Sequence, residues 1–206
     1  MLNDNIYFML GLPCSGKTTV GNILAKKYNM FYFSGDNRRF DYFKLADSSK
    51  HPYMTKDTSN FYEWSIKDMI EWEKGVISEQ TPFILSDLNN LSGNYDLILF
   101  DGILDLSLIS QIVNKKRVVY LTVSKEIIKN EFFNRDDHKP LLNSILSTTN
   151  ITLEEKERRI NLRKEVACNS FCDDTSVYGI KQFMRDERTS LVEMSHKIES
   201  HFELYK

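Results

Sequence analysis

The chain has 206 residues, of which 41% are hydrophobic and 27% are charged, and its formal net charge is −2. This length predicts one domain, or two at most, with a buried core, and the composition is that of an ordinary globular protein. No apolar run approaches the roughly 20 residues that cross a bilayer, and the net charge argues against a nucleic acid as the partner.

The first residues of the chain predict its compartment. They lack the basic segment of a signal peptide, and the chain has three cysteines. An odd number of cysteines without a signal peptide is typical of reduced thiols in the cytoplasm. We therefore expect a cytoplasmic protein with no membrane contact, and we expect it to be a monomer or a homodimer.

The first third of the chain alternates between apolar runs and helical patterns. Residues 5–10 form an apolar run before Gly11 and predict a buried parallel strand. A helix is expected over residues 18–28 and a second strand over 30–33. Residues 47–60 are polar and turn-rich, which predicts a surface loop of the kind that often contacts substrate in α/β enzymes.

The middle of the chain contains one ambiguous segment. A helix is expected over residues 61–78. The next segment is either a strand around residues 83–85 or a helix with Thr81 as its N-cap and Pro82 at its first position, and these two residues favour the helix. Residues 95–102 and 117–123 are clearer buried strands.

The last third of the chain is mostly helical in pattern. Helices are expected over residues 125–133, 153–171 and 181–199, and the fifth strand is either 176–180 or 201–205. Strands that alternate with helices predict a three-layer α/β sandwich with a parallel sheet of about five strands. The loops are short and no linker is visible, so we expect a single domain over residues 1–206.

The segment GLPCSGKTT matches the G-x-x-x-x-G-K-[ST] pattern of a phosphate-binding loop. The glycines allow turns that point backbone N–H groups at phosphate oxygens, Lys17 reaches the β- and γ-phosphates, and Thr18 coordinates Mg²⁺. A strand precedes the motif and a helix follows it, as the motif requires. We expect the nucleotide to contact Gly11, Pro13, Cys14, Ser15, Gly16, Lys17, Thr18 and Thr19.

A carboxylate is also expected near the metal. Asp101 ends an apolar strand, where it would face Mg²⁺ together with Thr18, and the alternative is a residue that only starts a turn before Gly102. Asp87 takes the metal role if the segment FILSD is the strand instead.

The segment SGDNRR follows the second strand, at the sheet edge where α/β proteins bind ligands. We expect Asp36 to accept or orient the proton of an acceptor hydroxyl and Arg39 to hold an anionic group of the acceptor. The alternative is that Asp36 is a helix N-cap beside two solvated arginines.

Further cations occur in the second half of the chain. Arg135 and Lys139, in a polar segment between helices, are candidates to close over the transferred phosphate. Arg158, Arg159 and Arg163 share a broad helix face, and the alternative for them is pairing with Glu154 and Glu155 on a solvated surface. Arg185, in the predicted last helix, either lines an adenine pocket or is exposed.

These motifs resemble three kinases. GLPCSGKTT and SGDNRR resemble adenylylsulfate kinase, and HKPLL with the following ERRINLRKEVA resembles the lid and next helix of shikimate kinase. FYFSGDNRR is also similar to phage polynucleotide 5′-kinase, with Asp36 as the base. By this resemblance the chain is identified as a P-loop small-molecule kinase of the nucleoside-monophosphate-kinase-like group.

The resemblance implies an ATP- and Mg²⁺-dependent phosphotransferase. It implies that Lys139 stabilises the transferred phosphate and that Arg159 binds a carboxylate of the acceptor. We expect the γ-phosphate to pass to a hydroxyl of a small polar metabolite, with an acceptor-binding insertion over about 40–94 and a lid over about 134–150.

Three alternatives differ from this hypothesis. The acceptor is a nucleotide or nucleoside in the first and a polynucleotide 5′-end in the second, which requires a basic channel. In the third the chain is a regulatory module that hydrolyses its nucleotide slowly. The sequence does not identify the acceptor or decide between ATP and GTP.

Overall fold

The computed structural model describes residues 2–171, 175–186 and 189–204. Its centre is a five-stranded sheet in the order β2-β3-β1-β4-β5, and every pairing is parallel. The strands are β1 Ile6–Gly11, β2 Phe31–Ser34, β3 Ile98–Gly102, β4 Val118–Val123 and β5 Lys181–Arg185. The predicted α/β sandwich with a parallel sheet is confirmed.

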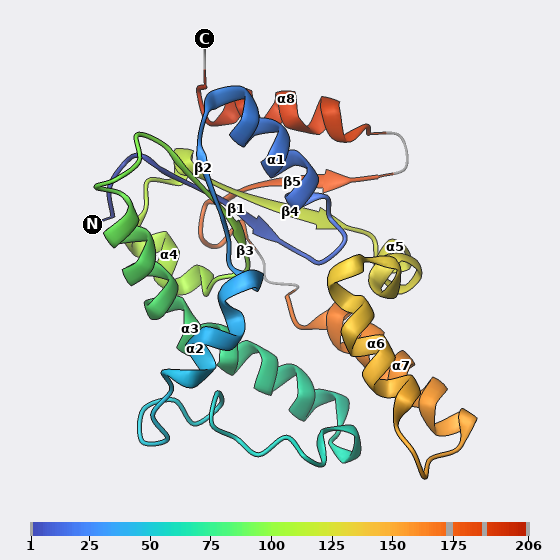
Figure 1. Ribbon diagram of the computed structural model, residues 1–206. Coiled ribbons are helices and arrows are strands. Elements are labelled where there is room, and N and C mark those ends of the chain that lie inside the picture. The colour runs from blue at the N-terminus through green and yellow to red at the C-terminus, as the bar shows by residue number, and fades with distance from the viewer. Residues whose placement is uncertain (1, 172–174, 187–188, 205–206) are drawn as a thin grey trace.

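Helices cover both faces of the sheet (Figure 1). One face carries α1 Lys17–Tyr28 and α8 Leu191–His201, and the other carries α3 Ile66–Leu91 and α4 Leu106–Ile112. Successive residues of a strand point to opposite faces, so Phe8 of β1 packs under α3 and α4 while Met9 packs under α1 and α8. Because β1 is buried on both faces, its sequence is a continuous apolar run.

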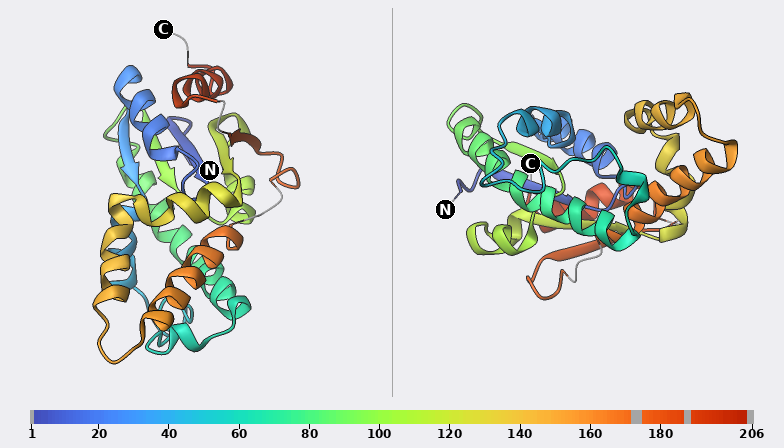
Figure 2. Two further views of the ribbon diagram at one scale, coloured as in Figure 1. Left: turned by 90° about the vertical axis from the view of Figure 1, so that its right-hand side faces the viewer. Right: turned by 90° about the horizontal axis from the view of Figure 1, so that it is seen from below.

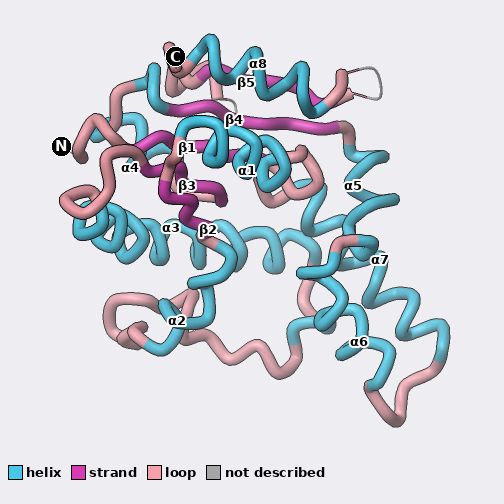
Figure 3. The backbone as a smooth tube through the Cα atoms, turned by 45° about the horizontal axis from the view of Figure 1, so that its top comes forward, coloured by secondary structure: helices cyan, strands magenta, loops and turns pink. Residues whose placement is uncertain are grey.

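The remaining helices begin at the carboxyl edge of the sheet. After β4 come α5 Lys125–Glu131, α6 Lys139–Ser147 and α7 Leu153–Asn169, which form an arm that extends from the sheet (Figure 2). After β2 come α2 Arg39–Lys44 and a long loop that leads to α3 (Figure 3). Both α2 and α7 pack against α3, so α3 joins the two regions.

The fifth strand lies outside both predicted positions. It is β5, Lys181–Arg185, and neither 176–180 nor 201–204 is a strand; residue 205 is outside the described residues. Among the described strands β5 pairs with β4 alone, so it is an edge strand. Its side chains alternate between half-buried and exposed, with Met184 58% exposed, and the apolar run that reveals a buried strand is missing.

The predicted helix over 181–199 is therefore wrong in its first part. The helix that the structure shows, α8, begins only at Leu191, with Ser190 as its N-cap: the Ser190 hydroxyl accepts a hydrogen bond from the backbone N–H of Glu193.

The segments predicted as two helices over 61–78 and 81–91 form one helix, α3, which begins at Ile66 after a short 3-10 turn at Phe61–Glu63. Thr81 is not an N-cap, because its hydroxyl donates to the carbonyl of Ile77 one turn earlier at 2.8 Å. Pro82 lies inside the helix. Packing of the buried α3 face against the sheet outweighs the local signal that Thr81 and Pro82 give.

The proposed lid segment contains regular structure that its sequence does not reveal. Two 3-10 turns, Phe132–Asn134 and Asp136–His138, lead into α6. Pro140 lies in the first turn of α6, where a proline is tolerated because its missing N–H has no partner there. In the part of the chain that the structure describes, no helix is long and apolar enough to cross a membrane.

Candidate active site

The loop between β1 and α1 has the backbone of a phosphate-binding loop. Gly11 has a φ of 140°, and a Cβ there would lie 2.0 Å from the carbonyl oxygen of Leu121, so only glycine fits. Gly16 has a φ of 91° and is the N-cap of α1, and Cys14 also has a positive φ of 61°. Two left-handed residues so close together turn the loop back on itself in front of a helix N-terminus, which is a site for anions.

Side chains hold this loop from inside. The Ser15 hydroxyl and the Lys17 ammonium both donate to the carbonyl oxygen of Leu12, each at 2.8 Å. Pro13 and Cys14 are buried, whereas Thr18 and Thr19 in the first turn of α1 are exposed. Lys17 is only 8% exposed, and burial lowers its pKa, while Asp101 and Asp36 act in the opposite direction.

Asp101 lies beside the loop, as the metal hypothesis requires. It is the fourth residue of β3 and is 4% exposed. Its Oδ2 accepts a hydrogen bond from the Thr18 hydroxyl at 2.8 Å and a second from the Tyr32 hydroxyl. The part of the chain that the structure describes contains no cluster of three or more His, Cys, Asp or Glu residues, so any metal here would take its other ligands from water or phosphate.

Asp87, the alternative metal carboxylate, lies elsewhere. It belongs to α3 and accepts a hydrogen bond from the Tyr42 hydroxyl at 2.8 Å, with Arg38 3.4 Å away. FILSD is helical, so Asp87 does not stand at the end of a strand, and this alternative is wrong.

Asp36 lies at the same sheet edge as Asp101. Ser34, two residues before it, pairs with Asp101 in the β2–β3 register. Asp36 is exposed and opens a 3-10 turn whose N-cap is Gly35, with no side-chain cap, so the N-cap alternative is wrong. Burial lowers the pKa of the Lys17 ammonium and the charge of Asp36 opposes this, so the segment after β2 lies near the phosphate loop.

Arg39 pairs with Glu73 of α3, a contact that the local sequence around Arg39 does not indicate. Its Nη2 donates to Glu73 Oε2 of α3 at 2.9 Å, and Arg163 of α7 lies 3.9 Å from the other oxygen of Glu73. Arg163 also stacks over Phe61, with 4.0 Å between its guanidinium carbon and the ring centre. This cluster joins α2, α3, α7 and the 3-10 turn before α3, and no sequence spacing points to it.

Arg159 lies at the margin of that cluster. It pairs with Glu155 at 2.8 Å, and its guanidinium carbon is 4.7 Å from the ring centre of Tyr62. The pair of Arg159 with Glu155 is the one that the solvated-face alternative predicts, whereas Arg158 pairs with Glu155 and not with Glu154, and it also reaches the backbone oxygen of Tyr62. Arg159 and Arg163 are therefore one helical turn apart on the side of α7 that faces the aromatic residues before α3.

Of the two lid cations, the structure brings only Arg135 to the loop. Arg135 binds Asp137 in a two-pronged pair, at 2.9 Å and 2.5 Å, and its charge acts on Lys17 and on the Cys14 thiol. Burial nevertheless raises the pKa of that thiol. Lys139 is 59% exposed in its side chain and pairs with Asp136, whose side chain is 92% exposed.

Arg185 also reaches the phosphate loop, from the end of β5 and not from a helix as predicted. Its Nη1 donates to the carbonyl oxygen of Cys14 at 2.6 Å and to Glu131 at 3.0 Å. Glu131 is the last residue of α5, just before the arm turns toward Arg135. Arg185 thus ties the loop to the base of the arm.

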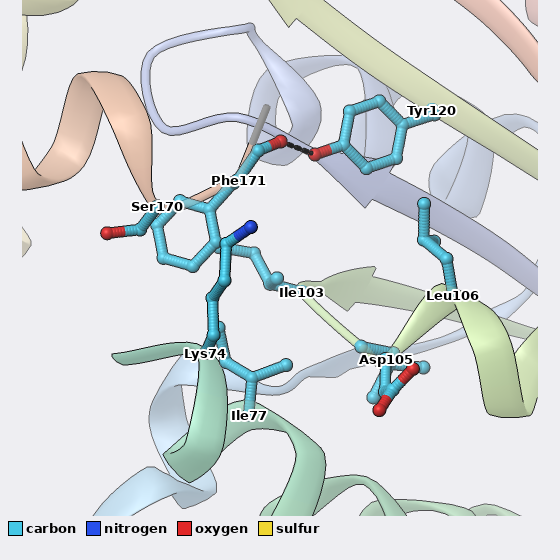
Figure 4. A pocket seen from close by; sticks show the side chains of 9 residues that line it. Lys74, Ile77, Ile103, Asp105, Leu106, Tyr120, Ser170 and Phe171 are labelled. Carbon is cyan, nitrogen blue, oxygen red and sulfur yellow. Dashed lines mark hydrogen bonds between the residues drawn. The ribbon is translucent and has the colours of Figure 1, made fainter. Parts of the chain in front are cut away.

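A small cavity lies next to this site, between α3, the segment after β3 and the end of α7 (Figure 4). Lys74 points into it, and the Tyr120 hydroxyl donates to the carbonyl of Phe171 at 2.5 Å on its far wall. Its volume of about 150 Å³ is below that of sites for drug-sized ligands. No phosphate-loop residue is among the described residues that line it, so it is not the nucleotide site.

Comparison with known proteins supports a kinase relationship. No protein-family model matches the chain. Shikimate kinase from two strains of Staphylococcus epidermidis is 30% identical over 134 residues, which is 64% of this chain and 66% of each relative. The match thus spans slightly less than two thirds of the length of these relatives.

Solved structures give weaker likenesses. Shikimate kinase from Bacteroides thetaiotaomicron is 13% identical, with 97% of this chain and 98% of that chain covered and a TM-score of 0.49. Deoxyadenosine kinase from M. mycoides, with products bound, is 15% identical, with 96% and 98% covered and a TM-score of 0.44. Likenesses at this level do not bear on function.

Proposed function

We propose that the chain is a P-loop small-molecule kinase of the nucleoside-monophosphate-kinase-like group and that it transfers the γ-phosphoryl group of Mg·ATP to a hydroxyl of a small polar metabolite; its similarity to shikimate kinase and its parallel sheet support this. The observation that carries the proposal is the contact between the phosphate loop and β3: Thr18, next to the buried Lys17, donates to Oδ2 of Asp101 at 2.8 Å. Asp36 comes after β2, Asp101 lies within β3 and Arg135 comes after α5, and the charges of all three act on the Lys17 ammonium.

The nucleotide half uses backbone and metal. The N–H groups of the loop bind the phosphates, and the Lys17 ammonium moves from the Leu12 carbonyl to the β- and γ-phosphates. Thr18 and Asp101 supply hard oxygen donors, which fit Mg²⁺, a metal that keeps several waters and phosphate oxygens as ligands. The chemistry that a bound Mg²⁺ supplies is neutralisation of charge on the β- and γ-phosphates.

The acceptor half supplies the base and the orientation. The acceptor oxygen forms a bond to the γ-phosphorus, the bond from that phosphorus to the bridging oxygen breaks, and ADP leaves with the electron pair. Asp36 takes the hydroxyl proton. Arg39 and Arg159 hold the polar group of the acceptor within the insertion of about 40–94, and Arg135 of the lid, about 134–150, stabilises the charge on the transferred group.

The experiment that tests this proposal is a screen of metabolite pools with γ-labelled ATP, in which any labelled product is identified by its mass. We expect one labelled organic phosphate with the wild type and none with Lys17→Ala. Release of labelled inorganic phosphate alone, from every pool, would instead support the regulatory module that hydrolyses its nucleotide slowly.

A further inference from the structure

Tyr32 contributes a hydroxyl that the proposed mechanism does not use. It lies in the middle of β2, and its hydroxyl donates to Oδ2 of Asp101, the same oxygen that accepts from Thr18. Neither donor uses Oδ1.

Gly21 makes room for the Tyr32 ring. A glycine inside a helix is less favourable than alanine, and Gly21 is in the middle of α1. A Cβ at this position would lie 2.8 Å from Cε2 of Tyr32 and would displace the ring. The helix α1 therefore has a residue of low helix propensity at the position where it contacts the Tyr32 ring.

We propose that Tyr32 is a positioning residue for the metal site: its phenol, for which Gly21 leaves room, fixes one oxygen of Asp101 against Thr18, so that the other oxygen could accept a hydrogen bond from a water ligand of Mg²⁺. This inference rests on the proposed function, since it assumes that Thr18 and Asp101 face Mg·ATP. Two donors on one oxygen hold the carboxylate plane more firmly than Thr18 alone, whose hydroxyl must also serve the metal.

The test measures ATP binding by calorimetry with Mg²⁺ and, separately, with EDTA, for Tyr32→Phe and the wild type. Loss of a hydrogen bond to an ionised group predicts about tenfold weaker binding in Mg²⁺. Binding in EDTA stays unchanged, because the loop backbone and Lys17 are untouched. The control is Tyr28→Phe, because Tyr28 lies at the other end of α1 and its hydroxyl also donates to a carboxylate, that of Glu199 in α8. This variant should bind ATP as the wild type does in both conditions.

A second variant separates positioning from structure. Gly21→Ala removes no hydroxyl and no carboxylate. It should nevertheless weaken binding in Mg²⁺ and not in EDTA, because the new methyl group displaces the Tyr32 ring and its hydroxyl from Asp101. If Gly21 is only a helix residue, alanine will stabilise the protein and leave binding unchanged.

Suppose that the wild type binds ATP more tightly with Mg²⁺ than with EDTA. Unchanged binding of Mg·ATP by Tyr32→Phe would then overturn the positioning role and leave the proposed function standing. Absence of any Mg²⁺-dependent binding in the wild type overturns the proposed function, and the positioning role with it. Asp101→Asn is the reference for complete loss of the carboxylate, and its defect should be at least as large as that of Tyr32→Phe.

Discussion

The phosphate loop and the proposed acceptor region meet at one edge of the sheet, but they are built differently. The loop is buried and held by contacts within a few residues, such as the hydrogen bonds from Ser15 and Lys17 to Leu12. The acceptor region is held by ion pairs between distant elements, such as Arg39 with Glu73 and Arg163 with Glu73. A nucleotide site can thus be fixed by local backbone, while the acceptor site depends on how α2, α3 and α7 pack.

The comparison predicts its largest effect at Lys17. Lys17→Ala should lower phosphoryl transfer by about 10³-fold or more, because this ammonium neutralises phosphate charge in a buried site. The fold should survive, since the Lys17 ammonium donates its hydrogen bond to the Leu12 carbonyl within the same loop and not to a distant element of the described residues. Transfer of label from γ-labelled ATP measures the rate and circular dichroism checks the fold. Wild-type turnover would show that the loop does not act in catalysis.

The arm should matter through Arg135 and not through Lys139. Arg135→Ala removes a cation that acts on Lys17 and should lower kcat by about 10²-fold with little change in ATP affinity, as expected for a contact made in the transition state. Lys139→Ala should lower kcat less than threefold, because Lys139 pairs with exposed Asp136. Steady-state kinetics on both variants decides, and a larger defect for Lys139→Ala would mean that the arm closes by a rearrangement absent from this structure.

A smaller effect is expected at Glu73. Glu73→Gln weakens its pairs with Arg39 and Arg163 and should lower the free energy of unfolding by about 1–2 kcal/mol while raising the KM for the acceptor more than it lowers kcat. The matched control is Glu193→Gln, which breaks the exposed pair with Lys197 and should change stability by less than about 0.5 kcal/mol. Urea unfolding measures the free energy of unfolding of both variants. Equal values would show that Glu73 does not stabilise the proposed acceptor region.

The same contrast explains what the sequence predicts and what it does not. The loop, four strands and Asp101 follow from local pattern, because a buried parallel strand is apolar throughout and a phosphate loop needs glycine at two fixed positions. Glu73, Phe61 and Tyr32 have no such pattern. Their roles arise from contacts across the fold, for example the Tyr32 hydroxyl reaching Asp101 from another strand.

Two errors have the same physical origin. The sequence does not predict the strand β5, because an edge strand that is half exposed to solvent needs no apolar run. Pro82 suggested a helix start, whereas the packing of α3 on the sheet keeps the helix continuous through it. Tertiary contacts determine the secondary structure of both segments, and these contacts are not visible in a stretch of about ten neighbouring residues.

The measurement that tests most directly whether the two regions serve one reaction is made on Asp36→Asn, with ATP affinity and transfer rate determined on the same preparation. Asparagine keeps the shape and loses the base, so transfer to the acceptor should fall by about 10²-fold or more. ATP affinity should stay within about twofold of the wild type, because the loop and Asp101 are unchanged. Unchanged transfer would contradict the account, since Asp36 would then have no part in the chemistry and the acceptor would bind away from the end of β2.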